Sequence, residues 1–578
     1  MMKTRRSRAR ISFMVIAVFA IVLVFVVRLV DIQLVQAEEL NAEALDKRAQ
    51  DRTINGVRGD IVDTSGAPLA SSVERYDITT SPRVVLGRQD VNDGVPEALA
   101  KLGEITGQDP AALMATITAD PESDHVYLTR KVTLDVYNAV QALDIPWLYY
   151  DLNPSRTYPN GAVAGNLIGF LNTDGPGGGL ELSEDKCLAS ENGSAVFERS
   201  EDGVALPGSQ VVTNEAVNGG TLKLTIDRDL QYYVQQRMIQ TAQQLGATWT
   251  TAVVMRVSDG HLMAVADYPS VDPNNVDGVP NTALGSYAFT APYEPGSTMK
   301  VLTAATLIDA GLATPATQVT APGRFYLSDG NYIKDAWVHG DTNYTLAGAL
   351  VDSSNTAFSI LTQGVDKDVR RDYMLKFGFD VETEVGFTGE AEGWVHPTQD
   401  WDERTNLTVG FGQGLTVTSV QLASAYQAIG NGGVRLPVTL VEGCEHEDGT
   451  VTDQPSTEPR RVVSESTARQ VLDMMEMRVT NGGDVAALTI PGYRLAAKSG
   501  TAEVAENGAY VDKSVLSFAG LAPAENPEYV VVVTAGVPSN MYNSSAMAQT
   551  FHDVMAQTLT SYRVQPSTTP GPNLPLTW

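Results

Sequence analysis

The hydrophobic pattern of the chain begins with an apolar run near the N-terminus. Residues 11–27 contain Ser12 as their only polar residue. At about 1.5 Å of rise per residue, a helix of this length approaches the thickness of the hydrocarbon core of a bilayer. Two further apolar residues follow Arg28, whose long side chain can reach back to the membrane interface. The pattern predicts a transmembrane helix over residues 11–30.

Beyond residue 220 the apolar positions follow the periods of short strands and amphipathic helices. Strands are expected at residues 221–226, 252–257, 262–267, 493–505, 514–521 and 529–535, and helices at residues 229–245, 347–362 and 545–560. Because strands lie at both ends of this region and helices fill its middle, the strands are expected to meet in one sheet covered by helices. Residues 221–562 therefore predict one mixed α/β domain. Residues 563–578 are rich in Pro and Thr and are expected to be a disordered tail.

Residues 31–220 have a less regular pattern, and we expect an irregular α+β module there. A strand, a turn and a second strand are indicated between residues 58 and 70, with helices near residues 95–118 and 132–143. The glycines between residues 156 and 208 favour turns, because the chain contains no Gly-x-x-x-x-Gly-Lys-Ser/Thr phosphate loop.

Charge is distributed unevenly along the chain. The net charge is −29, from 40 basic and 69 acidic residues, which argues against nucleic-acid binding. Five basic residues and no acidic residue precede the apolar run. By the positive-inside rule, residues 1–10 form a cytoplasmic basic tail, and the chain after residue 30 lies outside the cell membrane. The acidic charge of that outer part is expected to keep it soluble.

A cleaved signal peptide is the alternative to an anchor, because Val35-Gln36-Ala37 resembles a small-residue cleavage site. The apolar run is longer than the usual apolar core of a signal peptide, and Arg28 and Asp31 stand before that site. An uncleaved anchor is therefore the prediction.

Two cysteines, Cys187 and Cys444, cannot form a disulfide scaffold or a four-thiolate zinc site. In the predicted topology both face an oxidising compartment. Because they lie far apart in the sequence, two unpaired or buried thiols in different domains are expected, and a disulfide between them is the alternative.

Serine and lysine are the residues that offer chemistry in this chain. It contains no Gly-x-Ser-x-Gly elbow and no His-Glu-x-x-His, and its six histidines show no metal-ligand spacing. Pro295-Gly296 breaks the chain before an apolar helical run, so Ser297 is expected near a first helical turn, where free N–H groups favour developing negative charge. Lys300 follows on the same helix face. It can take the serine proton when burial or a second cation lowers its pKa.

Ser-x-x-Lys alone is a weak signal, and the chain contains it twice. Ser183-Glu184-Asp185-Lys186, with Ser190-Glu191-Asn192 behind it, lies in an acidic, turn-rich stretch without an apolar helix. We interpret this second match as coincidence.

The match at Ser297 is strengthened by two later motifs. Ser353-Ser354-Asn355 lies within a predicted helix, and Lys498-Ser499-Gly500-Thr501 lies within a predicted strand. Gly500 would allow a substrate to lie close to the strand backbone. Ser-x-x-Lys, Ser-x-Asn and Lys-Ser-Gly occur in the order found in penicillin-binding proteins and class A β-lactamases.

These motifs resemble those of a class B penicillin-binding protein, a monofunctional peptidoglycan D,D-transpeptidase. The resemblance extends from the anchor to about residue 562 and includes further segments, namely Arg58-Gly59-Asp60-Ile61, Arg156-Thr157-Tyr158-Pro159, Gly178-Gly179-Leu180-Glu181, Gly410-Phe411-Gly412-Gln413-Gly414, Val417-Thr418, Gln421-Leu422-Ala423 and Ser517-Phe518-Ala519-Gly520. Ser-Ser-Asn and Lys-Ser-Gly depart from the family's Ser-Asp-Asn and Lys-Thr-Gly, but they keep the hydroxyl, amide and ammonium groups. The resemblance implies the penicillin-binding transpeptidase fold, an antiparallel sheet covered by helices. A pedestal domain of the dimerisation type over residues 31–220 and one transmembrane helix would precede it.

The resemblance also implies roles for the first two motifs. Ser297 would attack the penultimate D-Ala carbonyl of a stem peptide ending in D-Ala-D-Ala, with Lys300 as the base, and release the last D-Ala. Ser353 would relay a proton toward the leaving amine. Asn355 would hold Lys300 and the substrate amide.

For the third motif, the resemblance implies that Lys498 lowers the pKa of Lys300 and attracts the terminal carboxylate of the substrate. Ser499, Gly500 and Thr501 would bind that end of the substrate. The N–H groups of Ser297 and Thr501 would form the oxyanion hole, and no metal or cofactor would be required.

The partners implied are stem peptides, β-lactams, the membrane, a glycosyltransferase and membrane proteins of the divisome, with no nucleic acid. The junction over residues 26–33 and the single compact pedestal resemble the division-specific, FtsI-like type, which implies a single-pass protein at the septum of a bacterial cell. An elongation-type relative is the nearer alternative.

A β-lactam sensor would need a signalling domain that ten cytoplasmic residues cannot form, and a non-catalytic scaffold would carry damaged motifs. A β-lactamase would be a smaller, unanchored domain.

Overall fold

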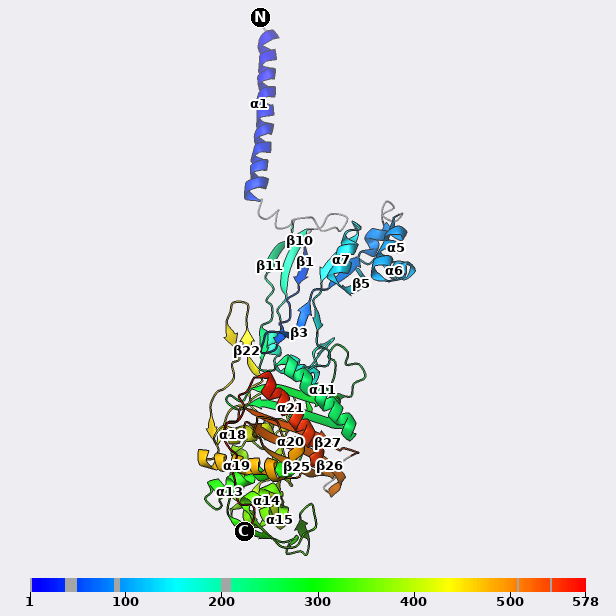
Figure 1. Ribbon diagram of the computed structural model, residues 1–578. Helices are drawn as coiled ribbons and strands as arrows, with labels where there is room; N and C mark the ends of the chain where they lie inside the picture. Colours follow the sequence, from blue (N-terminus) through cyan, green and yellow to red (C-terminus); the bar gives the residue numbers. More distant parts are fainter. Residues whose placement is uncertain (1–2, 37–48, 88–93, 199–208, 507–508, 541–542) are drawn as a thin grey trace. The chain divides into compact units, whose positions relative to one another are not determined.

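The computed structural model describes residues 3–36, 49–87, 94–198, 209–506, 509–540 and 543–578. The chain divides into two compact units (Figure 1). Unit 1 comprises Met1–Val57, Val73–Ser155 and Ser190–Asn218, and unit 2 comprises Arg58–Ser72, Arg156–Ala189 and Gly219–Trp578.

The N-terminal apolar run forms helix α1 (Lys3–Val30), which continues into a π-helical turn, η1 (Asp31–Val35). Arg10–Val35 is the one stretch in the described part of the chain that is long and apolar enough to cross a membrane. Its apolar side chains are exposed rather than packed on protein, as side chains that face lipid would be. At its end, Nη1 of Arg28 lies 2.5 Å from Oδ2 of Asp31. The expected N-terminal apolar helix is therefore present.

Unit 1 contains two three-stranded antiparallel sheets and several helices. The sheets have the orders β1-β10-β11 (Ala49–Ile54, Gly193–Glu198, Val211–Asn214) and β5-β4-β6 (Val126–Val132, Tyr76–Thr80, Leu148–Leu152). The apolar faces of three helices pack on the second sheet, namely α5 (Val95–Thr106), α6 (Pro110–Thr118) and α7 (Leu134–Gln141). The helical pattern near residues 95–118 thus forms two helices, because Gly107 turns the chain with a φ of +73° and Asp109 caps α6 before Pro110.

A five-stranded antiparallel sheet forms the centre of unit 2. Its order is β14-β13-β27-β26-β25 (Leu262–Tyr268, Trp249–Arg256, Tyr529–Gly536, Ala509–Ala522, Ala496–Glu506). Because side chains of a strand alternate between its faces, Val254 packs with α11 (Arg228–Leu245) and α21 (Ala548–Ser561), while Val253 packs with α13 (Met299–Asp309) and α18 (Ser419–Gly430). Figure 1 shows α21 in red beside α11 in green. The strands from both ends of the region meet in one helix-covered sheet, as the hydrophobic pattern predicted.

A six-stranded sheet brings early parts of the chain into unit 2. Its order is β23-β22-β12-β2-β3-β7 (Val451–Thr452, Val441–Glu445, Thr221–Leu224, Ile61–Val62, Pro68–Val73, Ser155–Thr157). Beside it, Nε of Arg58 and Nε of Arg156 each lie 2.7 Å from one oxygen of the fully buried Glu181 carboxylate. The expected boundary at residue 220 therefore does not coincide with the units, because β2 pairs in parallel with β12.

Cys187 and Cys444 form a disulfide with their Cα atoms 5.9 Å apart, so the expectation of unpaired thiols in different domains was wrong. Both lie in unit 2, Cys187 on α10 (Asp185–Leu188) and Cys444 on β22. The N–H of Gly220 donates to the carbonyl of Cys187, and Leu222 pairs with Cys444 across β12 and β22. A third segment, the start of β12, thus brings the cysteines together, and sequence separation does not reveal such a contact.

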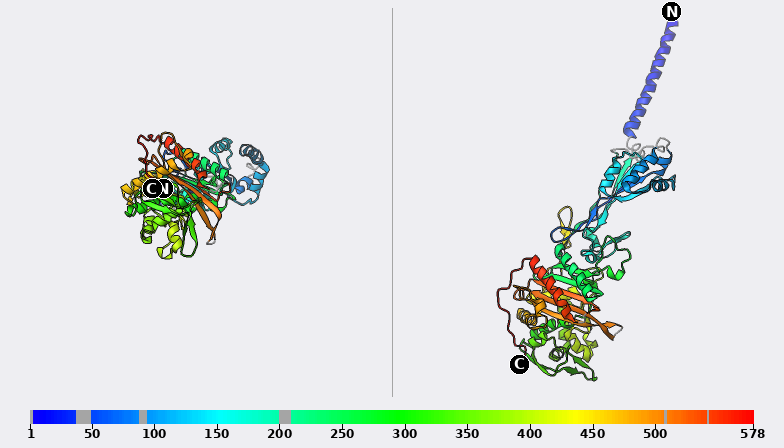
Figure 2. Two further views of the ribbon diagram at one scale, coloured as in Figure 1. Left: turned by 60° about the horizontal axis from the view of Figure 1, so that its bottom comes forward. Right: turned by 45° about the vertical axis from the view of Figure 1, so that its right-hand side comes forward.

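The C-terminal residues are packed against unit 2, in contrast to the expected disordered tail. The N–H of Ser567 donates to the carbonyl of Gly492, and the N–H of Thr345 donates to the carbonyl of Leu576. Oγ1 of Thr345 also donates to the carbonyl of Pro575 at 2.6 Å. In the right-hand view of Figure 2 the tail can be followed from red α21 to the C-terminus. Backbone hydrogen bonds, which composition does not reveal, order this segment.

Candidate active site

Ser297 lies in a 3₁₀ turn, η3 (Gly296–Thr298), directly before α13. It lines a cleft of about 450 Å³. Behind the turn, the N–H of Gly296 donates to the carbonyl of Gly412 at 2.9 Å. A Cβ atom on Gly412, whose φ is +85°, would lie 2.1 Å from the carbonyl oxygen of Gly296. The glycine-rich segment at residues 410–414 thus allows close backbone contact behind the predicted nucleophile.

Lys300 is fully buried in the first turn of α13, and four oxygen contacts surround its amine. Nζ lies 2.6 Å from the carbonyl oxygen of Ser353, 2.7 Å from Oδ1 of Asn355, 3.0 Å from Oγ of Ser297 and 3.2 Å from Oγ of Ser353. Burial lowers the pKa of Lys300 to about 7, although the charge of Asp335 opposes this shift. The two shortest contacts are to the Ser353 carbonyl oxygen and to Oδ1 of Asn355, which can only accept hydrogen bonds. They therefore accept from two N–H groups of the Lys300 amine. The lone pair of a neutral amine is then left for the hydroxyl proton of Ser297.

Ser353 stands at a break between two helices, α14 (Leu346–Val351) and α15 (Asn355–Thr362), where the sequence predicted one helix over residues 347–362. Its φ is +60°, a left-handed conformation that a non-glycine residue rarely adopts. Oγ of Ser354 accepts from the N–H of Ala357 at 3.1 Å and caps α15. The break presents both the carbonyl and the hydroxyl of Ser353 to the buried lysines.

Lys498 is the second fully buried lysine of the site. Its Nζ lies 2.9 Å from Oγ of Ser353 and 2.9 Å from the carbonyl oxygen of Ser499. Burial, followed by the charges of Arg478 and Lys300, lowers the pKa of Lys498 well below its ordinary value. The family resemblance implied that Lys498 would lower the pKa of Lys300. In the structure burial is the main cause of that shift, and the repulsion between the two amines lowers the pKa of Lys498.

The remaining predicted residues lie on β25, an edge strand of the sheet. Ser499 and Thr501 are two positions apart, so their side chains share a face, and both line the cleft with Ser297. A Cβ atom on Gly500 would lie 2.4 Å from Oγ of Ser517 and 2.7 Å from the carbonyl oxygen of Pro295. Gly500 is thus needed for packing against the turn before Ser297, which the sequence analysis did not foresee.

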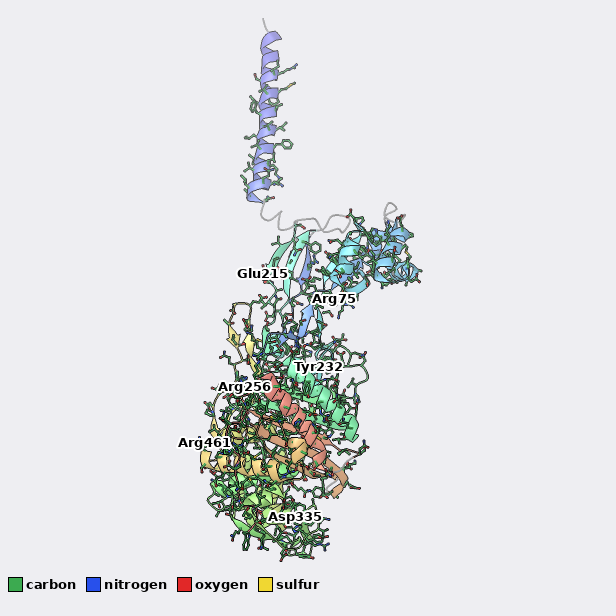
Figure 3. The ribbon with its side chains drawn as sticks, in the orientation of Figure 1. Arg75, Glu215, Tyr232, Arg256, Asp335 and Arg461 are labelled. Atoms are coloured by element: carbon green, nitrogen blue, oxygen red, sulfur yellow. A yellow bond between two sulfur atoms is a disulfide. The ribbon has the colours of Figure 1, made fainter. Side chains whose placement is uncertain are left out.

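Asp335, which is labelled in Figure 3, was not among the predicted site residues, although its hydrogen bonds support the second motif. It is buried, and its Oδ1 accepts from the N–H groups of Asn355 at 2.5 Å and Thr356 at 3.0 Å. Its Oδ2 lies 3.0 Å from Nε2 of His339. Asp335 directly follows a separate strand, β17 (Tyr332–Lys334). Its distance from Ser353 in the sequence therefore does not indicate that the two residues share a site.

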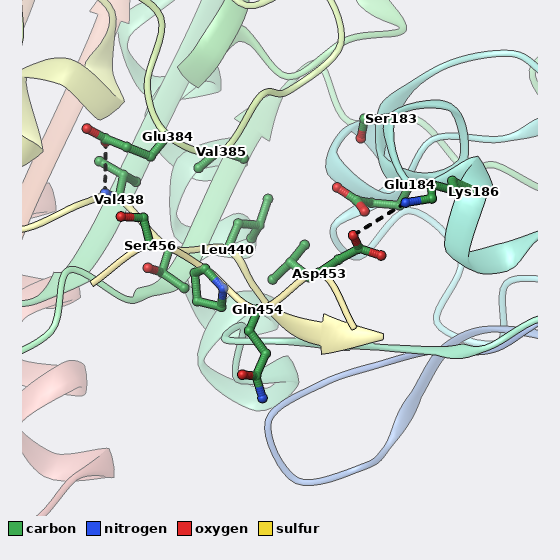
Figure 4. Close-up of a pocket in the computed structure, with 13 residues that line it drawn as sticks. Ser183, Glu184, Lys186, Glu384, Val385, Val438, Leu440, Asp453, Gln454 and Ser456 are labelled. Atoms are coloured by element: carbon green, nitrogen blue, oxygen red, sulfur yellow. Dashed lines mark hydrogen bonds and ion pairs between the residues drawn. The ribbon is translucent and has the colours of Figure 1, made fainter. Parts of the chain in front are cut away.

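The second Ser-x-x-Lys match does not bring a serine and a lysine together. Lys186 is 89% exposed and forms an ion pair with Asp453, with Nζ 3.8 Å from Oδ1 (Figure 4). Oγ of Ser183 has no hydrogen-bond partner among the described residues. Because the Ser183 hydroxyl has no hydrogen bond to the exposed Lys186, this geometry agrees with the interpretation as coincidence. Within the described residues no group of three or more His, Cys, Asp and Glu could hold a metal ion.

Two family models match the chain. The one described as Penicillin binding protein transpeptidase domain matches residues 250–556, which include the whole of the cleft's three motifs. The one described as Penicillin-binding Protein dimerisation domain matches residues 53–176.

Similar proteins cover almost the whole chain. The chain is 33% identical over 555 residues to Penicillin-binding protein PbpB of Mycolicibacterium smegmatis, covering 90% of this chain and 85% of that protein. It is 32% identical over 515 residues to Peptidoglycan D,D-transpeptidase FtsI of Escherichia coli, covering 88% of this chain and 84% of that protein. Among solved structures, a peptidoglycan synthetase from Bifidobacterium adolescentis superposes with a TM-score of 0.74 at 30% identity, covering 92% of this chain and 100% of that chain. Penicillin binding protein 3 from Mycobacterium tuberculosis, complexed with aztreonam, superposes with a TM-score of 0.71 at 28% identity, covering 91% and 100%.

Proposed function

The chain belongs to the class B penicillin-binding proteins, and we propose on this basis that it is a membrane-anchored peptidoglycan D,D-transpeptidase with Ser297 as its nucleophile. The observation that carries the assignment of Ser297 is the Lys300 amine, buried and 3.0 Å from its hydroxyl. A serine hydroxyl is a weak nucleophile unless a base accepts its proton, and Lys300 can be that base in its neutral form.

In the acylation step, Oγ of Ser297 forms a bond to the penultimate D-Ala carbonyl carbon, and its proton passes to Nζ of Lys300. The amide C–N bond then breaks, and the last D-Ala leaves with a proton on its amine. Ser353 is suited to deliver that proton, because its Oγ lies 3.2 Å from Nζ of Lys300 and 2.9 Å from Nζ of Lys498. Asn355 holds Lys300 through Oδ1 at 2.7 Å.

In the second step, an amine of a neighbouring stem peptide attacks the acyl-enzyme. The new C–N bond forms the cross-link, the ester C–O bond breaks, and the amine proton returns by way of Lys300 to Oγ of Ser297. The overall reaction exchanges one amide for another and needs no oxidant, metal or cofactor.

Charge developing on the carbonyl oxygen would be stabilised by the N–H groups of Ser297 and Thr501. One such donor contributes about 3–4 kcal/mol to comparable reactions. The terminal carboxylate would be bound by the hydroxyls of Ser499 and Thr501, beside Gly500. The position of β25 at the edge of the sheet supports this placement, because an extended peptide can pair with an edge strand.

The same nucleophile would be acylated by β-lactams, which carry a reactive amide in place of D-Ala-D-Ala. The similar protein from Mycobacterium tuberculosis has been crystallised with aztreonam and with ampicillin. A single N-terminal apolar helix and the likeness to FtsI support a single-pass membrane protein with its catalytic domain outside the cell.

We further propose that the protein acts at the division septum, with a glycosyltransferase and divisome membrane proteins as partners. The likeness to FtsI and the junction over residues 26–33 support this role. A fluorescent fusion should gather at midcell, and depletion should block division. Signal along the side walls with loss of cell shape would favour the elongation type instead.

The catalytic proposal is tested by labelling the membrane-extracted protein with a fluorescent penicillin and mapping the labelled peptide. Label is expected on the Ser297 peptide, and Ser297→Ala should abolish it. Ser183→Ala is the matched control, since it removes the serine of the second motif match, and it should label like wild type. Label on the Ser183 peptide would contradict the motif assignment.

A further inference from the structure

A buried arginine lies behind the strand that carries Ser499. Arg478 stands in the last turn of α19 (Glu465–Asn481) and is 7% exposed. Its Nη2 lies 2.7 Å from Oδ2 of Asp484 and 3.5 Å from Oγ of Ser499. Its Nη1 is buried and has no hydrogen-bond partner among the described residues. The contacts of the described chain therefore leave part of this guanidinium's donor capacity unused.

Asp484 holds the guanidinium in place, and Gly482 leaves room for it. A Cβ atom on Gly482 would lie 1.7 Å from Nη1 of Arg478, so a larger residue there would push the guanidinium aside. Asp484 accepts from Arg478 through one oxygen and from Oγ of Ser545 through the other, at 2.6 Å. Burial raises the pKa of Asp484, but the hydrogen bonds from Ser545 and Arg478 outweigh this and lower it. Asp484 is therefore ionised and fixes the arginine beside Ser499.

Arg478 and Lys498 differ in how firmly they keep their charge. The pKa of Lys498 is well below its ordinary value, because of burial and then of the charges of Arg478 and Lys300. A guanidinium keeps its proton in such surroundings. The recorded acceptors of Lys498 are Oγ of Ser353 and the carbonyl of Ser499, rather than the Ser499 hydroxyl. Among the described contacts, Arg478 is therefore the cationic group that donates to that hydroxyl, and its Nη2 also donates to Asp484.

We propose that Arg478 is a positioning residue for the terminal carboxylate of the acyl donor: acting through Ser499, it supplies the fixed positive charge by which the site selects donors that end in a carboxylate. This inference rests on the proposed transpeptidase function. Because Arg478 donates to Oγ of Ser499, the Ser499 hydroxyl proton is free to donate to the carboxylate of the ligand. A hydrogen bond to an ionised group is stronger than one between neutral groups. The family resemblance implied that Lys498 attracts the carboxylate. In this proposal Arg478 attracts it, and Lys498 takes part in proton transfer through Ser353.

The test compares two β-lactams that differ only in this carboxylate, benzylpenicillin and its methyl ester. Their second-order acylation rates are measured on the full, detergent-solubilised chain by competition with a fluorescent penicillin. The main variant combines Arg478→Gln with Asp484→Asn, because removing the arginine alone would leave a buried carboxylate unpaired.

The matched control combines Arg494→Gln with Glu476→Gln. It removes another largely buried ion pair, between Glu476 on α19 and Arg494 just before β25, in which Nη2 of Arg494 lies 2.5 Å from Oε2 of Glu476. Among the described contacts this pair does not touch Ser499. A second variant, Gly482→Ala, should displace the guanidinium without removing its charge. It replaces the main variant in the test if the main variant does not fold.

Wild type is expected to prefer benzylpenicillin over the ester. In the main variant that preference should fall about tenfold, through a weaker non-covalent complex, while the ester rate stays within about twofold of wild type. Gly482→Ala should also show a smaller preference for benzylpenicillin over the ester. The control variant should keep the wild-type preference. Equal slowing with both ligands, or an unchanged preference in a folded variant, would overturn the proposal. A wild type that reacts with neither ligand would overturn the proposed function itself.

Discussion

Nζ of Lys300, in the first turn of α13, lies 3.0 Å from Oγ of Ser297, which stands three residues earlier in η3. The same amine is held by the Ser353 carbonyl and the Asn355 amide oxygen, neither of which can give it a proton. Burial lowers its pKa to about 7. The central claim that follows is that Lys300 is a neutral amine in a large fraction of molecules near neutral pH, and that it is the base of acylation.

Asp335 opposes the lowered pKa of Lys300, so removing its charge should lower that pKa below about 7. In Asp335→Asn the acid limb of the acylation profile should therefore move to lower pH, because more of Lys300 is neutral at any given pH. The side-chain carbonyl that remains can still accept from the N–H groups at the start of α15. The check is the second-order rate of penicillin acylation as a function of pH.

The control for this charge change is Asp329→Asn. Asp329 lies in the exposed turn before β17, where it accepts from Asn331 at 2.9 Å. Its removal should leave the profile in place. A profile of Asp335→Asn that moves to higher pH would contradict the electrostatic account.

The disulfide should contribute stability rather than chemistry. Replacing Cys187 and Cys444 together by serine should lower the free energy of unfolding by about 2–5 kcal/mol, because the cross-link limits the unfolded chain. Acylation at 25 °C should stay within about twofold. Thermal unfolding of the double variant and wild type measures the first effect. Alkylation of both thiols in wild type without reductant would show that the bond is not formed.

The packed C-terminal residues should support the second motif. Thr345 caps α14 and donates two hydrogen bonds to the tail, to the carbonyls of Leu576 and Pro575, and α14 leads directly to Ser353. Deleting residues 566–578 should cost about 2–4 kcal/mol of stability, at roughly 1 kcal/mol per lost hydrogen bond, and should slow penicillin acylation. Deleting only the exposed Trp578 is the control and should change neither. A tail deletion whose thermal unfolding and rate of penicillin acylation match those of wild type would contradict this role.

The apolar helix should remain part of the mature protein. Mass analysis of the membrane-extracted chain should find residues 1–37 retained, because the run is longer than the core of a signal peptide. A mature form that starts at Glu38 would show a cleaved signal peptide instead.

Local relationships could be predicted from the sequence. Ser297 and Lys300 are separated by three positions at a helix start, so their proximity follows from helix geometry alone. Strand alternation likewise places Ser499 and Thr501 on one face of β25. The order of the three motifs then indicated that distant segments share a site.

Relationships made by a third segment could not be predicted. Cys187 meets Cys444 because Gly220 bonds Cys187 and the adjoining β12 pairs with Cys444, and Asp335 reaches Asn355 from beyond the end of a separate strand. The break at Ser353 was missed, although five polar residues, Asp352-Ser353-Ser354-Asn355-Thr356, interrupt the apolar pattern there and serine is common at the start of a helix. The tail was misjudged because its order comes from backbone hydrogen bonds, which composition does not reveal.

The most direct test of the central claim is the second-order rate of penicillin acylation of wild type and Lys300→Arg from about pH 5 to about pH 10. With a pKa of about 7 for Lys300, the wild-type rate should rise through the acid range and flatten just above neutral pH. Lys300→Arg should not be acylated at a measurable rate, because guanidinium keeps its proton while retaining the positive charge. A wild-type rate that climbs about tenfold per pH unit up to about pH 10 would contradict the neutral amine, as expected of a lysine with an ordinary pKa. An arginine variant within about tenfold of wild type would show that Lys300 is not the base.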